Sequence, residues 1–322
     1  MSTVMEQKQS TSVGKGTVRS GRPPFYQREW FWGYVFIAPT CIGLLIFNVY
    51  PILYSFFLSF TSWDGSSALK IVGLQNFVQM FHDPDFLQSM RNTLVYTVVV
   101  VPIGIALSVI VAVLLNGKVK GRIVWRTIFF LPSVTMPIAI GVVWKWIFNA
   151  NSGLLNYLLS FLGIHGPHWI SDPRYLLVSV MIVAIWGGIG YSMIIFLAGL
   201  QSIAPVYYEA AAIDGAGPMR QFFKITLPLL SPAIFFVLVT GLISALQVFD
   251  LPYIFVGAGS MTSDSVLVQA VRPIVMSIYQ NGFQFFKLGY ASAEAWVLFV
   301  IILIVTLIQM WLQKRWVHYE QG

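Results

Sequence analysis

Few residues in this chain have the spacing that catalysis requires. A nucleotide-binding P-loop needs G-x-x-x-x-G-K-[ST], in which backbone N–H groups cradle the phosphates and the lysine reaches the terminal phosphates. The segments Gly14–Gly16 and Gly117–Val119 contain Gly and Lys but have neither that spacing nor the hydroxyl residue. No cluster of metal ligands and no nucleophile with a neighbouring base is visible. We therefore expect no catalytic residue, metal site or cofactor in this chain.

The segment 201–230 has the most distinctive spacing in the chain. Pro205 suits the first turn of a helix, where its missing N–H costs nothing. The following residues favour a helix as far as Asp214, and Gly215 can adopt the left-handed conformation that ends it. A second helical piece is expected over 219–226, leading into the next apolar run. The sequence thus predicts a short exposed helix between two apolar runs.

The side chains of this short helix allow it to dock on a partner. Its alanines permit close approach of another backbone, and Tyr207 and Tyr208 provide a large contact area. The alternative is a helix lying in lipid headgroups, which typically carries Lys or Arg on its polar face. This helix carries Glu209 and Asp214, which anionic lipid would repel. Local chemistry leaves both interpretations open.

The composition is that of a membrane protein. Of the 322 residues 57% are hydrophobic and 10% are charged, whereas a soluble domain usually has about 25% charged residues. A net charge of +7 can indicate a nucleic-acid partner. In a membrane chain, basic loops beside anionic headgroups explain it, so no nucleic acid is expected.

Six apolar runs are long enough to cross a bilayer, so we expect an all-α protein with six transmembrane helices. These spans are 32–60, 93–115, 127–148, 175–200, 232–255 and 291–313. The first would be about 45 Å long and a bilayer core is about 30 Å thick, so a bend at Pro51 is expected. Pro132 and Pro137 have a similar part in the third span.

The remaining residues form tails. Residues 1–30 are polar and basic, and we expect a disordered tail there. The membrane domain would then cover 31–315, with a short tail over 316–322.

Basic residues set the expected orientation, because cytoplasmic loops carry an excess of Lys and Arg. With six spans, both termini share a side with the segments after spans two and four. The basic residues on that side are Lys8, Lys15, Arg19, Arg22, Arg28, Lys118, Lys120, Arg122, Arg126, Arg220, Lys224, Lys314 and Arg315. Those on the other side are Lys70, Arg91, Arg174, Arg272 and Lys287. Both termini and 201–230 are therefore expected in the cytoplasm, and 61–92 and 256–290 outside.

The spacing within 201–230 resembles that of a known family. Glu209-Ala210-Ala211, three residues, Gly215, nine residues and Ile225-x-Leu227-Pro228 are similar to the EAA loop of permeases in binding-protein-dependent ABC importers. In that family the loop forms a coupling helix, which sits in a cleft of the ATP-binding subunit. The resemblance implies the type I importer permease fold. It implies the coupling role for Glu209, Ala210, Ala211, Asp214 and Gly215.

The resemblance covers roughly residues 30–315 and is greatest to the carbohydrate-uptake branch. Matching stretches are Arg126–Pro132, Trp144–Phe148, Gly153–Asn156 and Gly289–Ala293. They are similar to the first permease of glycerol-3-phosphate, lactose, arabinose and multiple-sugar systems, and to the core of the maltose permease. Gly257–Ser260 departs from the Gly-Gly-Pro frequent there, which leaves the course of that segment open.

Candidate pathway residues in span four lie in the run Trp186–Tyr191. Glycines permit close approach, and aromatic faces suit a pyranose ring. Tight helix packing at small residues is the alternative. In the maltose permease sugar contacts come from the equivalent span, and the resemblance implies contacts for Gly188 and Tyr191.

Polar residues in span five are further candidates. Ser244, Gln247 and Asp250 have side chains that can exchange hydrogen bonds with sugar hydroxyls. For Asp250 a structural carboxylate satisfied by neighbouring backbone is the alternative. Lys145, between two tryptophans, is interpreted as an interfacial anchor that reaches outward.

The expected function is one half of the pathway of an ATP-driven sugar importer in a bacterial cytoplasmic (inner) membrane. The expected partners are a second homologous permease, two ATP-binding subunits that supply ATP and Mg²⁺ chemistry, an external solute-binding protein and the lipid bilayer. One alternative is an ABC importer for a non-sugar solute such as a polyol phosphate. Another is an ion-coupled secondary transporter, against which the scarcity of charged residues in the spans argues.

Overall fold

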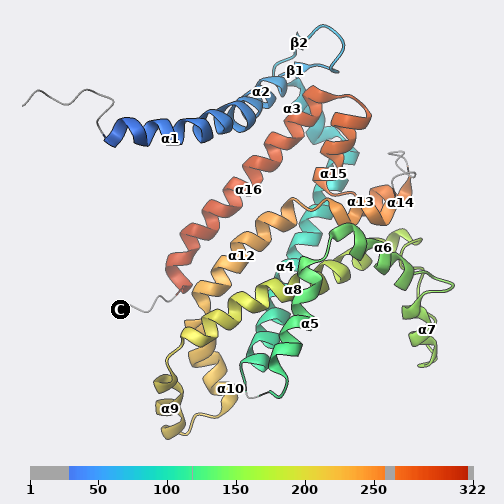
Figure 1. Cartoon of the computed structure of the whole chain (residues 1–322). Helices are drawn as coiled ribbons and strands as arrows, with labels where there is room; N and C mark the ends of the chain where they lie inside the picture. The colour runs from blue at the N-terminus through green and yellow to red at the C-terminus, as the bar shows by residue number, and fades with distance from the viewer. Residues whose placement is uncertain (1–28, 118, 258–264, 318–322) are drawn as a thin grey trace, which may run out of the picture. The chain divides into compact units, whose positions relative to one another are not determined.

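The computed structural model describes residues 29–117, 119–257 and 265–317. Most of the expected tail 1–30, part of the segment 256–290 and the last residues of the tail 316–322 lie outside these ranges. The chain divides into two units, one ending at Tyr54 and the other beginning at Ser55. Apart from one small sheet, the elements described are helical (Figure 1).

The first unit is a helix with exposed side chains. It contains α1 (Glu29–Leu44), the π-helical turn η2 (Leu45–Val49) and the start of α2 (Tyr50–Leu58). The expected bend at Pro51 takes the form of a wider turn just before that residue, where the N–H of Tyr50 bonds to the carbonyl of Leu45. Proline lacks an N–H and its ring crowds the carbonyl four residues earlier, so the helix widens there.

The spans of the second unit are longer than the apolar runs predict. Its long or membrane-depth helices are α4 (Pro84–Asn116), α5 (Arg122–Val134), α6 (Pro137–Ile147), α8 (Pro173–Ser202), α12 (Ser231–Leu246), α13 (Asp250–Val256) and α16 (Leu288–Trp316). Helix α4 begins early because the Asp83 carboxylate accepts a bond from the N–H of Asp85 and Pro84 occupies the first turn. With the helix over 29–58 included, the described residues contain five helices long and apolar enough to span a membrane. If α5 and α6 together form one broken span, the number is six, as expected.

The third span, expected over 127–148 with a bend at its prolines, is broken into two helices. Helices α5 and α6 meet at an angle of 101°. Thr135 and Met136 between them have extended backbones, with ψ of 142° and 129°. The residue before a proline is driven out of the helical region, and Pro137 restarts the helix at its first turn.

The fifth span is also interrupted. Helix α12 ends at Leu246 and α13 starts at Asp250, with Phe249 at φ −141° between them. A continuous helix would place Pro252 in its interior, where it removes a hydrogen bond and clashes with a carbonyl. The break moves this proline into the first turn of a new helix, where it is tolerated.

Short elements fill the connecting segments, including those expected as outer loops. They are β1 (Thr61–Ser62), β2 (Lys70–Ile71), α3 (Gln75–His82), α7 (Leu154–Ser160), α9 (Pro205–Ile213), α10 (Pro218–Gln221), η3 (Phe222–Thr226), α11 (Leu227–Leu229), α14 (Val266–Val271), α15 (Ile274–Tyr279) and η4 (Gln280–Gln284). The two strands pair antiparallel, with Thr61 opposite Ile71.

Helices α4, α5 and α12 pack around α8. Phe148 and Val180 lie in one fully buried cluster, while Met193 and Phe196 lie in another. The contact of α5 with α8 depends on Gly190, because a Cβ there would meet the carbonyl of Phe129 and the Cα of Phe130. Packing is thus the role of this glycine, as one interpretation of Trp186–Tyr191 expects.

We expect Gly190→Ala to destabilise the second unit by about 1–3 kcal/mol, because backbone atoms of α5 must move. Gly187→Ala, three residues away, is the matched control, because a Cβ there would meet nothing within 4 Å. Thermal unfolding of the purified complex measures both. Equal melting temperatures for the two variants would contradict the packing role.

Candidate functional site

The short helix predicted within 201–230 is present as α9. Pro205 is its first residue and Ile213 its last. The backbone of Ala204 is extended, as expected before a proline. A second helical stretch over α10 and η3 leads into α12, so the expected order of elements is confirmed.

The end of α9 is a Schellman motif. Gly215 has φ +74°, a conformation that favours glycine. The N–H of Ala216 bonds to the carbonyl of Ala211 at 2.8 Å, and the N–H of Gly215 bonds to that of Ala212 at 3.1 Å. These two bonds satisfy carbonyls that the end of a helix leaves unpaired. The turn after α9 is therefore fixed by local hydrogen bonds.

One side of α9 and the turn after it is an exposed surface with apolar and acidic side chains. Ile213 is 87% exposed and Met219 is 74% exposed. Glu209, Ala210 and Asp214 are exposed as well. Neither carboxylate forms an ion pair within the described part of the chain. In this chain α9 therefore presents unpaired acids and large apolar side chains to its surroundings.

The two tyrosines of α9 have different environments. Tyr207 is 44% exposed, whereas Tyr208 packs against the buried cluster that contains Leu200, Ile203 and Leu230. The Tyr208 hydroxyl lies 3.0 Å from the Thr226 hydroxyl. Tyr208 thus joins α9 to the ends of α8 and α12, while Tyr207 is free for an external contact.

The structure brings two of the five predicted pathway residues together. Gly188 and Ser244 line a cavity of about 200 Å³ between α4, α8 and α12. The other polar and small residues in its wall were not predicted. Two of them, Gly104 and Gly241, are glycines in apolar spans, which is the one signal the sequence offers for them. The side chains added to the set are Tyr96 and Ser192.

The other three predicted pathway residues lie outside this cavity. Tyr191 is 56% exposed on the next part of α8. Gln247 and Asp250 are exposed at the break between α12 and α13. Asp250 has no hydrogen bond to any described residue, so the alternative of a backbone-satisfied structural carboxylate gains no support.

An aromatic cluster that the sequence did not predict surrounds this break. Phe249 lies 5.0 Å from Tyr253 and 5.3 Å from Tyr279 between ring centroids. Tyr279 belongs to α15, far along the chain, so no local spacing indicates this contact. The cluster lies at the same break in the chain as Gln247 and Asp250.

The model of the family described as "Binding-protein-dependent transport system inner membrane component" matches residues 104–318. The chain belongs to this family of permeases. The permease is 42% identical to the "Probable ABC transporter permease protein YesP" of Bacillus subtilis (strain 168), over 89% of this chain and 92% of that protein.

Other relatives carry the names of transported solutes. The permease is 35% identical to the "Sulfoquinovosyl glycerol transport system permease protein SmoG" of Agrobacterium fabrum, over 85% of this chain and 87% of that protein. It is 35% identical to the "sn-glycerol-3-phosphate transport system permease protein UgpA" of Shigella flexneri, over 94% and 99%.

A solved structure has the same fold. A chain in the crystal structure of a bacterial alginate ABC transporter in complex with an alginate pentasaccharide-bound periplasmic protein matches with a TM-score of 0.77 and 24% identity. The match covers 88% of the permease and 94% of that chain. The expected importer permease fold is therefore confirmed.

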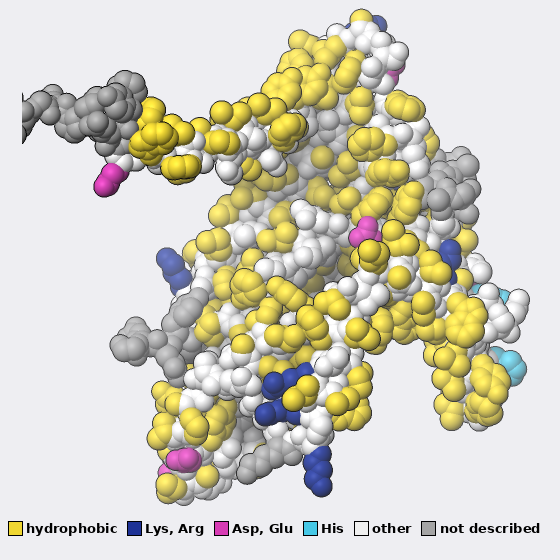
Figure 2. Space-filling view, in the orientation of Figure 1, with side chains coloured by type: hydrophobic (Ala, Val, Ile, Leu, Met, Phe, Trp, Pro, Cys, Tyr) yellow, Lys and Arg dark blue, Asp and Glu magenta, His cyan; other side chains and the backbone are white. Residues whose placement is uncertain are grey.

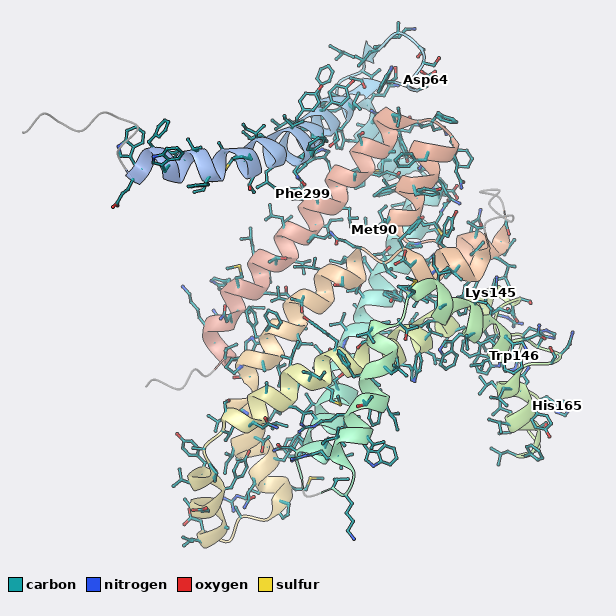
Figure 3. The ribbon with its side chains drawn as sticks, in the orientation of Figure 1. Asp64, Met90, Lys145, Trp146, His165 and Phe299 are labelled. Atoms are coloured by element: carbon teal, nitrogen blue, oxygen red, sulfur yellow. The ribbon has the colours of Figure 1, made fainter. Side chains whose placement is uncertain are left out.

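Lys145, expected as an interfacial anchor, forms a hydrogen bond within the protein. Its Nζ donates to the carbonyl of Ile254 at 3.2 Å, in the last turn of α13. Carbonyls at a helix C-terminus lack intrahelical partners and attract cations. The lysine therefore ties α6 to α13 in the permease (Figure 3).

Glu294, a carboxylate inside the last span, was not predicted as a functional residue. Its side chain is fully buried and accepts bonds from Ser277 at 2.8 Å and Asn281 at 3.0 Å. Charged residues at this depth are costly, so the partners are needed to hold it. Glu294 thereby fixes the amide of Asn281, with its NH₂ group toward the carboxylate.

We expect Tyr208→Phe and Thr226→Val each to weaken the attachment of α9 by about 1 kcal/mol, since each removes the same hydrogen bond. Hydrogen exchange at the amides of 205–213 should then accelerate about fivefold. The double variant should resemble either single one. Tyr207→Phe is the control, because its hydroxyl has no bond to a described residue. Additive effects in the double variant would refute the shared bond.

Proposed function

We propose that the permease forms one half of the translocation pathway of an ATP-driven, binding-protein-dependent sugar importer. Helix α9 would dock in a cleft of a separate ATP-binding subunit, and α8 and α12 would line the pathway with a second, homologous permease. Two ATP-binding subunits would supply ATP hydrolysis with Mg²⁺. A solute-binding protein would deliver sugar to the opposite face, and both termini would lie in the cytoplasm.

One observation carries the coupling part of this proposal. Helix α9 is exposed on one side and attached by Tyr208, on the other, to the cluster where α8 and α12 meet. A force on α9 therefore reaches both helices that carry Gly188 and Ser244. Such a lever fits a rigid-body switch between two arrangements of packed helices.

Surface chemistry supports the proposed orientation. Four basic residues lie in or next to the start of α5 and the segment α10–η3 that follows α9. They are Lys120, Arg122, Arg220 and Lys224. Figure 2 shows dark blue side chains at that end and a largely apolar surface along the long helices. Basic groups concentrate on the cytoplasmic side of membrane proteins.

The candidate pathway favours an uncharged solute. The cavity between α4, α8 and α12 has no charged side chain in its wall. The charge among the predicted pathway residues is the carboxylate of Asp250, which would repel phosphate. An importer for a polyol phosphate, suggested by the sn-glycerol-3-phosphate relatives, is therefore the second candidate. The family match favours ATP over an ion gradient as the energy source.

The proposal is tested by uptake into vesicles that hold the reconstituted importer. Sugar uptake should require enclosed ATP and the solute-binding protein, and it should persist when ion gradients are collapsed. Uptake driven by an ion gradient without ATP would overturn the mechanism. Uptake of glycerol 3-phosphate in place of sugars would favour the second candidate.

We expect Gly215→Asp to leave the complex assembled. The amount of sugar taken up per ATP hydrolysed should fall at least tenfold. Gly215 combines a left-handed backbone with open space around its Cα, so a side chain there would meet a docked partner. Gly217→Asp is the control, because Gly217 has an ordinary φ of −67°.

A third variant separates the two possible causes. Asparagine tolerates the left-handed conformation but still carries a side chain. Uncoupled Gly215→Asn therefore identifies a steric block to docking, and coupled Gly215→Asn identifies backbone strain. Full coupling in Gly215→Asp itself would sink the docking assignment.

A further inference from the structure

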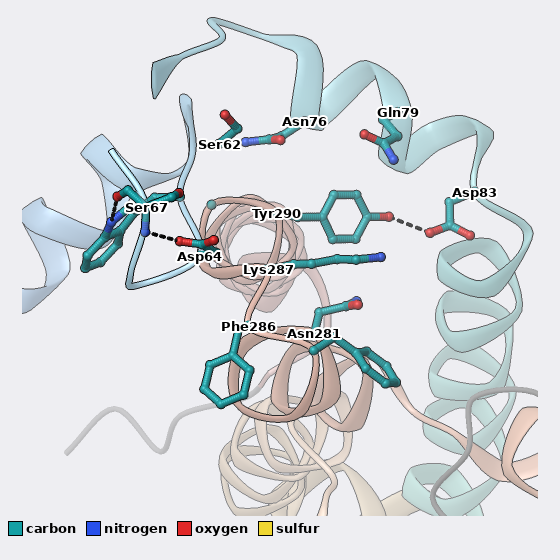
Figure 4. A pocket seen from close by; sticks show the side chains of 13 residues that line it. Ser62, Asp64, Ser67, Asn76, Gln79, Asp83, Asn281, Phe286, Lys287 and Tyr290 are labelled. Atoms are coloured by element: carbon teal, nitrogen blue, oxygen red, sulfur yellow. Dashed lines mark hydrogen bonds between the residues drawn. The ribbon is translucent and has the colours of Figure 1, made fainter. Parts of the chain in front are cut away.

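A second cavity in the described part of the permease lies away from the candidate pathway. It has a volume of about 390 Å³, within the range of about 300–1,000 Å³ typical of small-molecule sites. Three segments form it: the β1–β2 hairpin, α3, and the stretch from η4 to the start of α16 (Figure 4). By the proposed orientation, it opens on the face to which sugar is delivered.

Hydrogen bonds fix the segments around this cavity. The N–H of Gly289 bonds to the carbonyl of Trp63 at 3.2 Å, which joins the hairpin to α16. A Cβ at Gly289 would collide with the carbonyl of Thr61, so the approach requires glycine. The Tyr290 hydroxyl donates to Asp83 at 2.7 Å and joins α16 to the start of α4. The walls are therefore held before any ligand arrives.

The amide side chains in the wall are preoriented as hydrogen-bond acceptors. The NH₂ group of Asn76 donates to the carbonyls of Ser59 and Thr61 at 2.8 and 2.9 Å. The NH₂ group of Asn281 donates to Glu294 at 3.0 Å. Each side-chain carbonyl remains without a partner among the described residues. An oriented acceptor of this kind lowers the entropic cost of binding a hydroxyl.

Donors complete the set of polar groups. Lys287 lines the cavity, is exposed, and forms no ion pair with a described residue. The Gln79 amide has no hydrogen bond in the described structure and supplies both donors and an acceptor. The wall thus offers donors and acceptors side by side, as a polyhydroxyl ligand requires because each hydroxyl is both.

The charges in the wall oppose an anionic ligand. Asp64 accepts bonds from the N–H groups of Ser67 and Ser66 at 2.7 and 2.9 Å, and these bonds lower its pKa to about 2. Asp64 is therefore ionised at neutral pH. Two carboxylates, those of Asp64 and Asp83, face the single ammonium of Lys287. A phosphate or a carboxylate of a partner protein would meet a net negative wall.

Aromatic side chains border the polar groups. Trp63, Phe285 and Phe286 line the cavity, and Phe286 is 60% exposed. Phe286 has φ +53°, an uncommon conformation for a residue with a Cβ. Two backbone bonds flank it. The N–H of Phe285 donates to the backbone carbonyl of Gln280 at 2.9 Å, and the N–H of Lys287 donates to the backbone carbonyl of Asn281 at 2.7 Å. The aromatic faces provide apolar surface for the C–H face of a ring.

We propose that this cavity is an outer saccharide subsite, which binds one ring of a neutral pyranose sugar before it enters the pathway. Lys287, Gln79 and the carbonyls of Asn76 and Asn281 would bond its hydroxyls, and the aromatic border would contact its apolar face. This proposal rests on the proposed sugar importer.

Saturation-transfer NMR on the whole importer in lipid nanodiscs, without ATP and without the solute-binding protein, tests it directly. The probes are methyl glycosides of glucose, galactose, mannose and xylose at millimolar concentration, with glucuronate and glycerol 3-phosphate as anionic comparisons. We expect at least one neutral glycoside to bind. We expect Lys287→Gln to weaken that binding about tenfold, since it removes a hydrogen bond from a charged group.

Lys70→Gln is the matched control. Lys70 lies in the β1–β2 hairpin beside the cavity and is exposed, but it does not line the cavity. The ammonium of Lys287 forms no hydrogen bond or ion pair with a described residue, so its variant should assemble normally. Absence of neutral glycoside binding, equal binding by the Lys287 variant, or stronger binding of the anions would each overturn the subsite. The vesicle uptake of the parent importer is independent of these results and decides the proposed function separately.

Discussion

The bilayer requires every backbone N–H and C=O group to find a partner within the protein, and the architecture of this permease depends on that constraint. Two of its spans are nevertheless broken, between Val134 and Pro137 and between Leu246 and Asp250. The freed groups can be tolerated only where protein covers them. The two short helices that follow the breaks, α6 and α13, pack on each other, so the helix that follows each break lies against the helix that follows the other.

The contact of α6 with α13 shows how this cover is built. The ammonium of Lys145 supplies a donor for the carbonyl of Ile254, and the side chain of Ile254 packs against Gly141. Phe148, at the end of α6, lies fully buried beside Phe255 of α13. A charge, a glycine and two rings thus hold together two segments that a simple apolar pattern would treat as independent spans.

Local rules predicted much of the fold because the features concerned are local. Pro205 and Gly215 set the ends of α9 within a few residues of themselves, and the apolar runs mark membrane depth. The breaks were harder. Pro137 and Pro252 indicate that a regular helix cannot continue through them. Whether the helix kinks or ends there depends on neighbours that can bond to the freed backbone groups.

The features of the candidate site that depend on residues nearby in the sequence were predictable, and those that depend on distant residues were not. The exposed acids of α9 follow from its own sequence, whereas the inward position of Tyr208 depends on Thr226, which lies on η3. Gly190 and Gly188 stand two residues apart in one motif, yet one packs against Phe129 and the other opens to a cavity. Sequence spacing cannot separate them, because the difference is which helix crosses at each point. Glu294 was not predicted because its partners, Ser277 and Asn281, come from a segment outside the apolar runs.

The same physical preference recurs at the two cavities, although they share no residue. The wall between α4, α8 and α12 contains no charge, and the outer cavity has more carboxylates than ammonium groups. Each environment disfavours an anion, the inner one by desolvation and the outer one by repulsion. An anionic solute would therefore face a barrier at both places. A neutral ring with hydroxyl groups would exchange hydrogen bonds with Asn281 and Lys287 outside and with Ser244 inside. That agreement between independent sites is the physical reason for assigning a neutral sugar, rather than a phosphate, to this pathway.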